Sequence, residues 1–173
     1  KDGVEELLQQ SSAYIDQRSI DKKVYPKQIA FNSIPFVDCF LENNYTREEM
    51  KMVWETHKIL DENISVNPTA VRVPVLVGHA ESIYIETEKE IDIELAKNCL
   101  NEFAGISVID NVQEVDFPTS FEHGHGTDDV YVGRIRKGLS KNNSLNLWVV
   151  ADNVRKGAAL NSIPVSYTHL TLP

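Results

Sequence analysis

Long apolar runs are missing from this 173-residue sequence, and no stretch approaches the roughly 20 consecutive apolar residues that a membrane helix needs. Basic residues are also too few for a nucleic-acid-binding protein. The 17 lysines and arginines stand against 26 aspartates and glutamates, for a formal net charge of −9. Binding to a phosphate backbone needs a basic face. We therefore expect neither a nucleic acid nor a membrane as a partner.

Cysteine is scarce as well, because the sequence contains only Cys39 and Cys99, both in apolar surroundings. A pair this sparse argues against a disulfide framework and favours buried thiols in a reducing compartment. We therefore expect a cytoplasmic protein. Residues 1–6 do not form a secretory signal and contain no initiator methionine. From this start we expect the chain to begin inside a longer protein.

Two glycine-rich phosphate-binding motifs, G-x-G-x-x-G and the P-loop, do not occur. Each lets backbone N–H groups approach a phosphate at a helix N-terminus. Without them, the chain cannot bind a dinucleotide alone by the usual β-α-β route. The rest of the composition is ordinary for a globular protein, with 42% apolar and 25% charged residues in a length that fits one domain.

Hydrophobic periodicity and turn residues predict alternating helices and strands. The best-marked helix starts at Thr46, because residues 46–49 read Thr-Arg-Glu-Glu, the pattern of a capping box. Other helices are expected over residues 3–16, over 91–105 with a stripe of Ile91, Leu95, Cys99 and Phe103, and from Asn153 onward. Strands are expected over 29–32, 69–77, 82–87, 106–109, 130–135 and 145–150, with a loop over 116–129. This order favours an α+β fold with a mixed, largely antiparallel sheet.

Glu48 and Lys51 are the first candidate site residues. They are three residues apart on the first turn of the expected helix, so they lie on one face. Lys51 is near a helix N-terminus, where N–H groups already favour an anion. Together they suit a phosphorylated amino acid, with Glu48 for an ammonium and Lys51 for a phosphate. The alternative is a solvated ion pair that only stabilises the helix.

Arg72 and His79 are the next candidates. Arg72 lies within an apolar stretch, where a guanidinium needs an anionic partner, either an internal carboxylate or a substrate. His79 suits a general acid or base, although a lone histidine is more often structural. In one straight strand the two side chains would point to opposite faces. A shared site therefore requires a bend, and Pro74 and Gly78 are where we expect it.

The segment 123–129, His-Gly-His-Gly-Thr-Asp-Asp, superficially suggests a zinc site. Zinc sites need three or four placed ligands, and this segment lacks the final histidine of the metallo-hydrolase pattern. We therefore interpret it as a polar surface loop and expect no metal.

Several segments, taken together, resemble aspartate-β-semialdehyde dehydrogenase. They are residues 28–35, 45–56, 71–79, 132–136 and 146–159. The resemblance runs from about residue 3 to residue 163. It implies the C-terminal substrate-binding and dimerisation domain of that family, over residues 1–163. In this fold, helices cover one face of the sheet and the other face forms a dimer interface. The implied assembly is a homodimer, with a tetramer as the alternative.

The resemblance also implies an activity. The family converts 4-phospho-L-aspartate to L-aspartate 4-semialdehyde with NADPH, a step toward lysine, threonine, methionine and isoleucine. By motif, Glu48 binds the substrate amino group, Lys51 the phosphate and Arg72 the α-carboxylate. His79 is the implied general acid/base, and Asn153 contacts the nicotinamide end of NADP.

The sequence departs from the family pattern in three ways. Neither Cys39 nor Cys99 lies in the context of the family's nucleophilic cysteine, the N-terminal NADP-binding domain is missing, and residues 164–173 form an atypical tail. We therefore predict that this chain alone is inactive. Two alternatives remain: a non-catalytic dimerisation or binding module of the same fold, and an N-acetylglutamyl-phosphate reductase. The second would leave Glu48 without an ammonium to bind.

Overall fold

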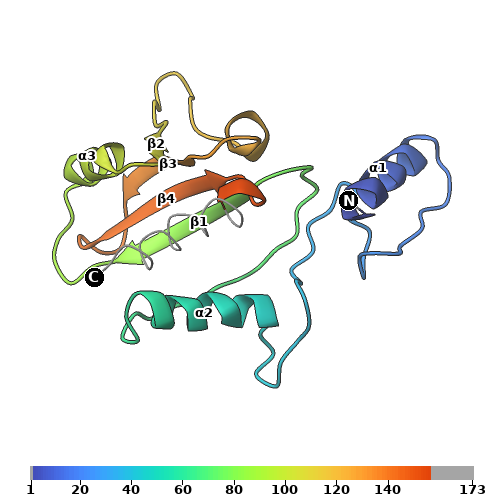
Figure 1. Ribbon diagram of the computed structural model, residues 1–173, viewed down its shortest axis with the longest axis horizontal. Coiled ribbons are helices and arrows are strands. Elements are labelled where there is room, and N and C mark those ends of the chain that lie inside the picture. The colour runs from blue at the N-terminus through green and yellow to red at the C-terminus, as the bar shows by residue number, and fades with distance from the viewer. Residues whose placement is uncertain (1, 157–173) are drawn as a thin grey trace, which may run out of the picture. The chain divides into compact units, whose positions relative to one another are not determined.

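The protein is seen in a computed structural model, in which residues 2–156 are described (Figure 1). It divides into two compact units, one up to Pro74 and one from Val75 onward. Each unit is described by itself. Within the residues covered, no helix combines the length and the apolar character that crossing a membrane requires.

The first unit is built around α1 (Asp2–Ile15), which the sequence predicted. Leu7 of this helix packs in a core cluster with Ile29, Ala30 and Ile34. The same face carries a buried amide, since Gln10 Oε1 accepts the N–H groups of Ile29 (2.9 Å) and Ala30 (3.2 Å). These bonds satisfy backbone donors that would otherwise be stranded in the core.

Two expected strands, over residues 29–32 and 69–77, are wrong. Residues 29–32 form a turn, because the N–H groups of Ile29 and Ala30 bind Gln10 instead of a neighbouring strand. Residues 69–77 are also irregular apart from one antiparallel bridge between Ile34 and Arg72. Pro74 lies within the second segment, and Pro35 follows three residues after the first; a proline has no N–H for a ladder.

Helix α2 (Arg47–Ile59) confirms the expected capping box. The Thr46 hydroxyl accepts the N–H of Glu49 at 3.3 Å, and the Glu49 carboxylate accepts the N–H of Thr46 at 2.7 Å. The cap marks where the helix begins.

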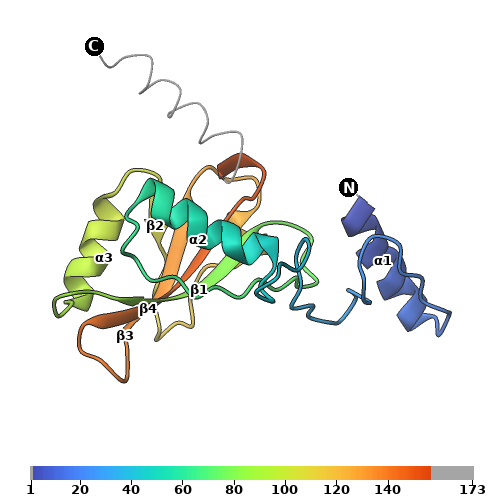
Figure 2. The same cartoon turned by 90° about the horizontal axis from the view of Figure 1, so that it is seen from below.

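The second unit contains a four-stranded sheet of order β1-β4-β3-β2 (Figures 1 and 2). Its strands are β1 (His79–Glu86), β2 (Ile106–Val108), β3 (Val130–Lys137) and β4 (Ser144–Ala151). The β1–β4 and β3–β4 pairs are antiparallel, whereas β2 pairs with β3 in parallel. This mixed, largely antiparallel sheet confirms the predicted α+β class and four of the expected strands.

Helix α3 (Ile93–Glu102) contacts β2 and β3, but its expected apolar stripe is wrong. The side chains that face inward are the half-buried Ile93, Ala96, Lys97 and Leu100, spaced by three and four residues. Leu95, Cys99 and Phe103 are exposed. Lys97 explains the choice of face, because it pairs at 3.0 Å with the largely buried Asp110 just after β2. Cys99 is therefore not the buried thiol that the sequence suggested.

The loop expected over 116–129 contains a short π-helix, η1 (Ser120–Gly124), which the sequence did not predict. It packs against β4, β1 and β3. Trp148 of β4 donates its indole N–H to the Pro118 carbonyl at 3.0 Å, which holds the approach to η1 against the sheet. The helix expected from Asn153 extends outside the described residues, as do residues 164–173.

Candidate functional site

The first turn of α2 presents Glu48 and Lys51 on one side, as predicted. Lys51 Nζ lies 3.1 Å from Glu48 Oε2, with both side chains a little under half exposed. The hydrogen bond to Glu48 and the charge of that carboxylate raise the pKa of Lys51. Both groups keep unused hydrogen-bonding positions toward solvent, since an ammonium has three donors and a carboxylate about four lone-pair sites. The pair can therefore exchange with the charges of a ligand at little cost in desolvation.

Arg72 is exposed, so the expectation of a guanidinium within an apolar strand is wrong. Its backbone is held firmly by Ile34: the N–H of each residue donates to the carbonyl of the other at 2.9 Å. Its guanidinium lies 5.6 Å from the centre of the Tyr25 ring. Among the described residues no carboxylate pairs with it. The Arg72 guanidinium thus lies near the Tyr25 ring, and its N–H donors are available to a carboxylate from solution.

Glu49 connects these two parts of the first unit, and the sequence did not single it out beyond its role in the cap. One carboxylate oxygen accepts the N–H of Thr46 at 2.7 Å and the other accepts the N–H of Ala70 at 2.9 Å. The side chain is buried. The backbone hydrogen bonds from Thr46 and Ala70 lower the pKa of Glu49. An ionised carboxylate thus ties the start of α2 to the segment that leads into Arg72.

In the second unit, His79 is the first residue of β1 and is exposed. Gly78 before it adopts a left-handed conformation (φ 79°), so the bend expected at this glycine is present. A Cβ at Gly78 would lie 3.1 Å from both the Cβ and the carbonyl oxygen of Ser120. Only glycine therefore suits the entry into this strand.

Asn153 lies at the same end of the sheet as His79, because His79 pairs with Ala151 in the β1–β4 register. Asn153 itself is exposed in the turn after β4. Its neighbour Asp152 is buried and accepts the N–H groups of Gly126, Val154 and Arg155, each at 2.8 Å. These bonds, that from Arg155 first, lower the pKa of Asp152. Asp152 is a second organising carboxylate that the sequence did not indicate.

The chain matches the model of the semialdehyde dehydrogenase dimerisation domain over residues 1–156. It belongs to the semialdehyde dehydrogenase family. The match confirms the resemblance drawn from the sequence and covers all the residues that the structure describes.

Named relatives within this family are aspartate-semialdehyde dehydrogenases. That of Shewanella violacea is 52% identical over 167 residues, which are 96% of this chain and 49% of the relative. That of Legionella pneumophila is 48% identical over the same share of this chain and 48% of its own. The chain thus spans about half the length of the curated relatives it matches.

Among solved structures, aspartate semialdehyde dehydrogenase II complexed with ASA from Vibrio cholerae superimposes with a TM-score of 0.92. It is 46% identical and covers 96% of this chain, which in turn covers 49% of that chain. The fold extends to the more distant aspartate semialdehyde dehydrogenase with NADP from Candida albicans, with a TM-score of 0.59 and 24% identity, over 73% of this chain and 40% of that one.

The loop of residues 123–129 is part of the framework at the His79 end of this dehydrogenase domain. Its Gly126 N–H binds Asp152, and its Asp128 pairs with Arg155 at 2.6 Å. His123 Nδ1 accepts the N–H of Thr119 at 3.1 Å, which places any proton of a neutral ring on Nε2. Within residues 2–156, no group of three or more histidine, cysteine or acidic side chains is arranged to hold a metal ion.

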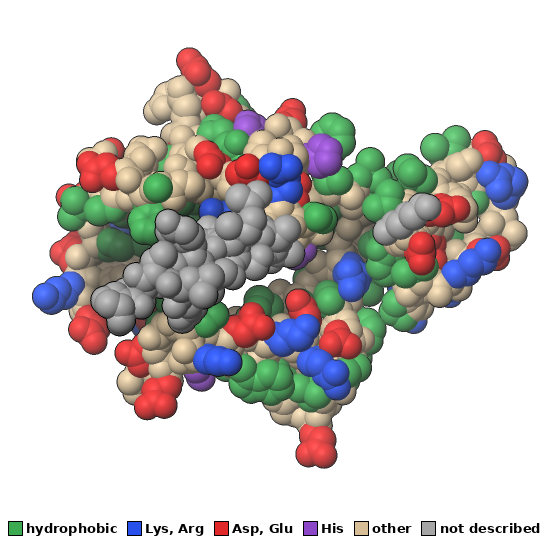
Figure 3. Space-filling model, in the orientation of Figure 1, with side chains coloured by type: hydrophobic (Ala, Val, Ile, Leu, Met, Phe, Trp, Pro, Cys, Tyr) green, Lys and Arg blue, Asp and Glu red, His purple; other side chains and the backbone are tan. Residues whose placement is uncertain are grey.

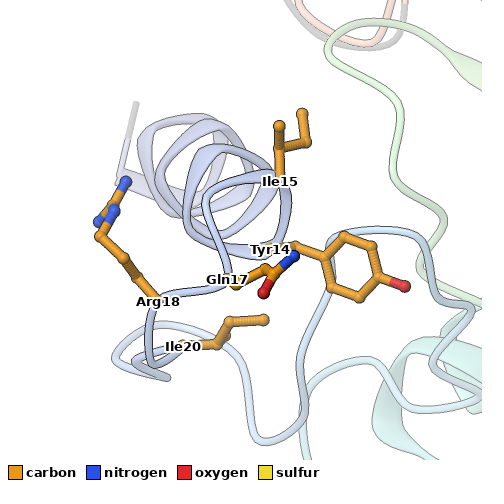
Figure 4. Close-up of a pocket in the computed structure, with 5 residues that line it drawn as sticks. All are labelled: Tyr14, Ile15, Gln17, Arg18 and Ile20. Atoms are coloured by element: carbon orange, nitrogen blue, oxygen red, sulfur yellow. The ribbon is translucent and has the colours of Figure 1, made fainter.

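Two surface hollows of the described residues lie elsewhere. The first, at the C-terminal end of α1, is lined by Tyr14, Ile15, Gln17, Arg18 and Ile20 (Figure 4). A second includes the buried Glu6 and Gln10 of α1. Neither is lined by any of the five residues predicted from the sequence. Four of those five residues are exposed and Glu48 is partly exposed. On the face drawn in Figure 3, charged side chains of both signs are interspersed.

Proposed function

We propose that this chain supplies the substrate-binding part of an enzyme that interconverts 4-phospho-L-aspartate and L-aspartate 4-semialdehyde with NADP(H). The observation that carries the proposal is the charge set of the first unit. Glu48, Lys51 and Arg72 together offer a carboxylate, an ammonium and a guanidinium, each accessible enough to take a ligand charge. The substrate has one ammonium, one phosphate and one α-carboxylate. The aspartate-semialdehyde dehydrogenase names of the relatives support the same substrate.

In this proposal, Arg72 binds the α-carboxylate through two parallel N–H···O bonds, the geometry for which a guanidinium is suited. Glu48 binds the ammonium and Lys51 the phosphate. The ion pair between them keeps both side chains charged and extended before the substrate arrives. Exchange of one ion pair for two contacts with the substrate limits the desolvation cost that isolated charges would incur.

His79 is proposed as the general acid/base. It is exposed, and among the described residues its ring has no recorded hydrogen bond or ion pair, so a substrate group can reach it. The nucleophile is proposed to lie outside these 173 residues. Cys39 is only partly exposed, and Cys99 lies on the outer side of α3, away from β2 and β3.

NADP is implied by the family; when bound, NADPH would supply the hydride that reduces the acyl group to the aldehyde, and NADP+ would accept a hydride in the reverse direction. The described residues do not suit most of this molecule, because they contain no glycine-rich turn between a strand and a helix for a pyrophosphate. Asn153, exposed in the turn that Asp152 organises, is proposed to contact only the nicotinamide end. Most of the cofactor site is therefore proposed to lie outside this chain, and the chain alone is predicted to be inactive.

A homodimer in the cytoplasm is part of the same proposal. The dimerisation-domain match supports an oligomer, and large apolar side chains such as Phe103, Phe121 and Leu139 are exposed in the second unit. Two free cysteines are consistent with a reducing compartment. The proposed metabolic role is in the biosynthesis of lysine, threonine, methionine and isoleucine.

The test is an assay of the dehydrogenase that contains this chain, with phosphate and NADP. We expect NADPH formation with L-aspartate 4-semialdehyde and at least about 100-fold lower kcat/KM with N-acetylglutamate 5-semialdehyde, because an acylated amine leaves Glu48 unpaired. Preference for the acylated substrate would instead assign the acylglutamyl-phosphate reductase activity. Inactivity with both would favour the non-catalytic module.

A further inference from the structure

Glu49 is a buried carboxylate whose two oxygens are used by different segments of the first unit. One oxygen accepts the N–H of Thr46, immediately before α2, at 2.7 Å. The other accepts the N–H of Ala70, 21 residues further along the chain, at 2.9 Å. A capping box needs only the first of these bonds. The second bond has no role in capping. It joins the start of α2 to a segment that has no regular secondary structure.

Each segment carries proposed substrate-binding groups. The first turn of α2 holds Glu48 and Lys51 on either side of Glu49 in sequence. Ala70 precedes Arg72 by two residues, and the backbone of Arg72 is paired in both directions with Ile34 at 2.9 Å. The Arg72 segment therefore has two attachments: Ile34 holds the residue itself, and Glu49 holds the chain that leads into it.

We propose that Glu49 is a positioning residue for the substrate, setting the spacing between the carboxylate site at Arg72 and the ammonium and phosphate sites at Glu48 and Lys51. This inference rests on the proposed function. The substrate is a short molecule whose charged groups are a few bonds apart. A shift of about 1 Å between the two segments would therefore weaken binding of the whole molecule, even with all three contacting side chains intact.

Both oxygens of Glu49 must act as acceptors, which only the ionised carboxylate provides. The two backbone N–H groups and the lowered pKa of Glu49 are consistent with ionisation at neutral pH. Glutamine has the same length but one acceptor oxygen, and its NH2 group would face an N–H donor. Glu49→Gln should therefore break one of the two attachments and leave the side chain in place.

The test compares Glu49→Gln with Thr46→Ala in the dehydrogenase that contains this chain. Thr46→Ala removes the other half of the same capping box, the hydroxyl that accepts the Glu49 N–H at 3.3 Å. It leaves the backbone N–H at position 46 and both carboxylate bonds of Glu49 intact. We expect Glu49→Gln to raise the KM for L-aspartate 4-semialdehyde about tenfold or more, with the KM for NADP within twofold. Thr46→Ala should leave both constants within twofold.

Amide hydrogen exchange at Ala70 gives a readout besides activity. Exchange there should accelerate in Glu49→Gln and not in Thr46→Ala. Equal effects of the two variants on the semialdehyde KM, or an unchanged KM in Glu49→Gln, would overturn the positioning role while leaving the proposed function intact. A wild-type enzyme that does not use the semialdehyde would overturn both.

Discussion

At the scale of single residues, the candidate groups of the second unit depend on carboxylates that contact backbone. Asp152 joins the turn that carries Asn153 to the loop of residues 123–129 through three N–H bonds. Such a carboxylate stabilises the fold only while it is ionised. The contribution of Asp152 to the stability of the fold should therefore depend on pH.

For Asp152, the folded pKa lies below the ordinary value near 3.9. Its stabilising effect is thus fully present above about pH 4 and is lost as the pH falls through the folded pKa. We expect Asp152→Asn to lower the melting temperature by a few degrees at pH 7, and the difference from wild type to shrink below pH 4. The exposed Asp21→Asn is the control. A difference that stays constant down to pH 3 in thermal scans would contradict the assignment.

His79 is the residue on which proton transfer depends in the proposed mechanism. A positioned general acid or base contributes about 10²–10⁴-fold to a rate. We therefore expect His79→Gln to reduce kcat by a factor in this range, with small changes in the KM for semialdehyde. His57→Gln is the control, because the His57 ring bonds the Ile64 carbonyl at 2.8 Å in the first unit. A kcat for His79→Gln within threefold of wild type would remove His79 from the mechanism.

At the scale of elements, the sequence predicted the helix starts and strands that local residue patterns determine. The capping box marks the start of α2, and alternation marks β1, whose register with β4 extends over all eight residues of each strand. The predicted apolar stripe of α3 was wrong because Ala96 and Lys97 face inward. The partner that determines this orientation, Asp110, lies beyond β2 in the sequence. The predicted strand over residues 29–32 was wrong because Gln10, nineteen positions before Ile29, accepts hydrogen bonds from N–H groups that a strand ladder would use.

The candidate site likewise contains residues that local motifs predict and residues that only long-range contacts identify. Glu48, Lys51, Arg72, His79 and Asn153 were predicted from motifs, and their functional roles stay predictions. Glu49 was visible as part of a capping box, but its bond to Ala70 is a long-range contact that no local pattern encodes. Asp152 likewise depends on Gly126, 26 residues away in sequence. Contacts of this kind come from the fold.

Strand β3 provides a test at this scale, because Gly133 lies where two chain segments approach the sheet closely. A Cβ at Gly133 would clash with the Ile109 carbonyl oxygen and with the Pro118 ring. We expect Gly133→Ala to lower the free energy of unfolding by about 3 kcal/mol, the upper part of the range for overpacking, since a backbone atom cannot move aside.

Gly126→Ala is the matched control, because open space surrounds Gly126 and only its φ of 73° opposes a side chain. Its cost should be about 1 kcal/mol. Urea unfolding of both variants measures the difference. If Gly133→Ala were no more destabilising than Gly126→Ala, the close approach of Ile109 and Pro118 to β3 would be wrong.

At the scale of the whole molecule, the chain is one part of a larger catalytic arrangement in our account. The family match covers residues 1–156, whereas the relatives are about twice as long as the aligned region. We propose that this part recognises the substrate's three charges and supplies a proton-transfer group. The nucleophile and most of the NADP site are proposed to lie outside these 173 residues.

The central claim is that charged side chains of the first unit bind the free amino acid end of the substrate. Glu48→Gln tests this claim most directly. The measurement is kcat/KM for L-aspartate 4-semialdehyde in the dehydrogenase that contains this chain. Loss of a charge-assisted contact with the ammonium is worth about 1.5–3 kcal/mol, so we predict a fall of about 10- to 100-fold, with the KM for NADP unchanged. A kcat/KM equal to that of the wild type would show that Glu48 does no more than pair with Lys51, and would contradict the account.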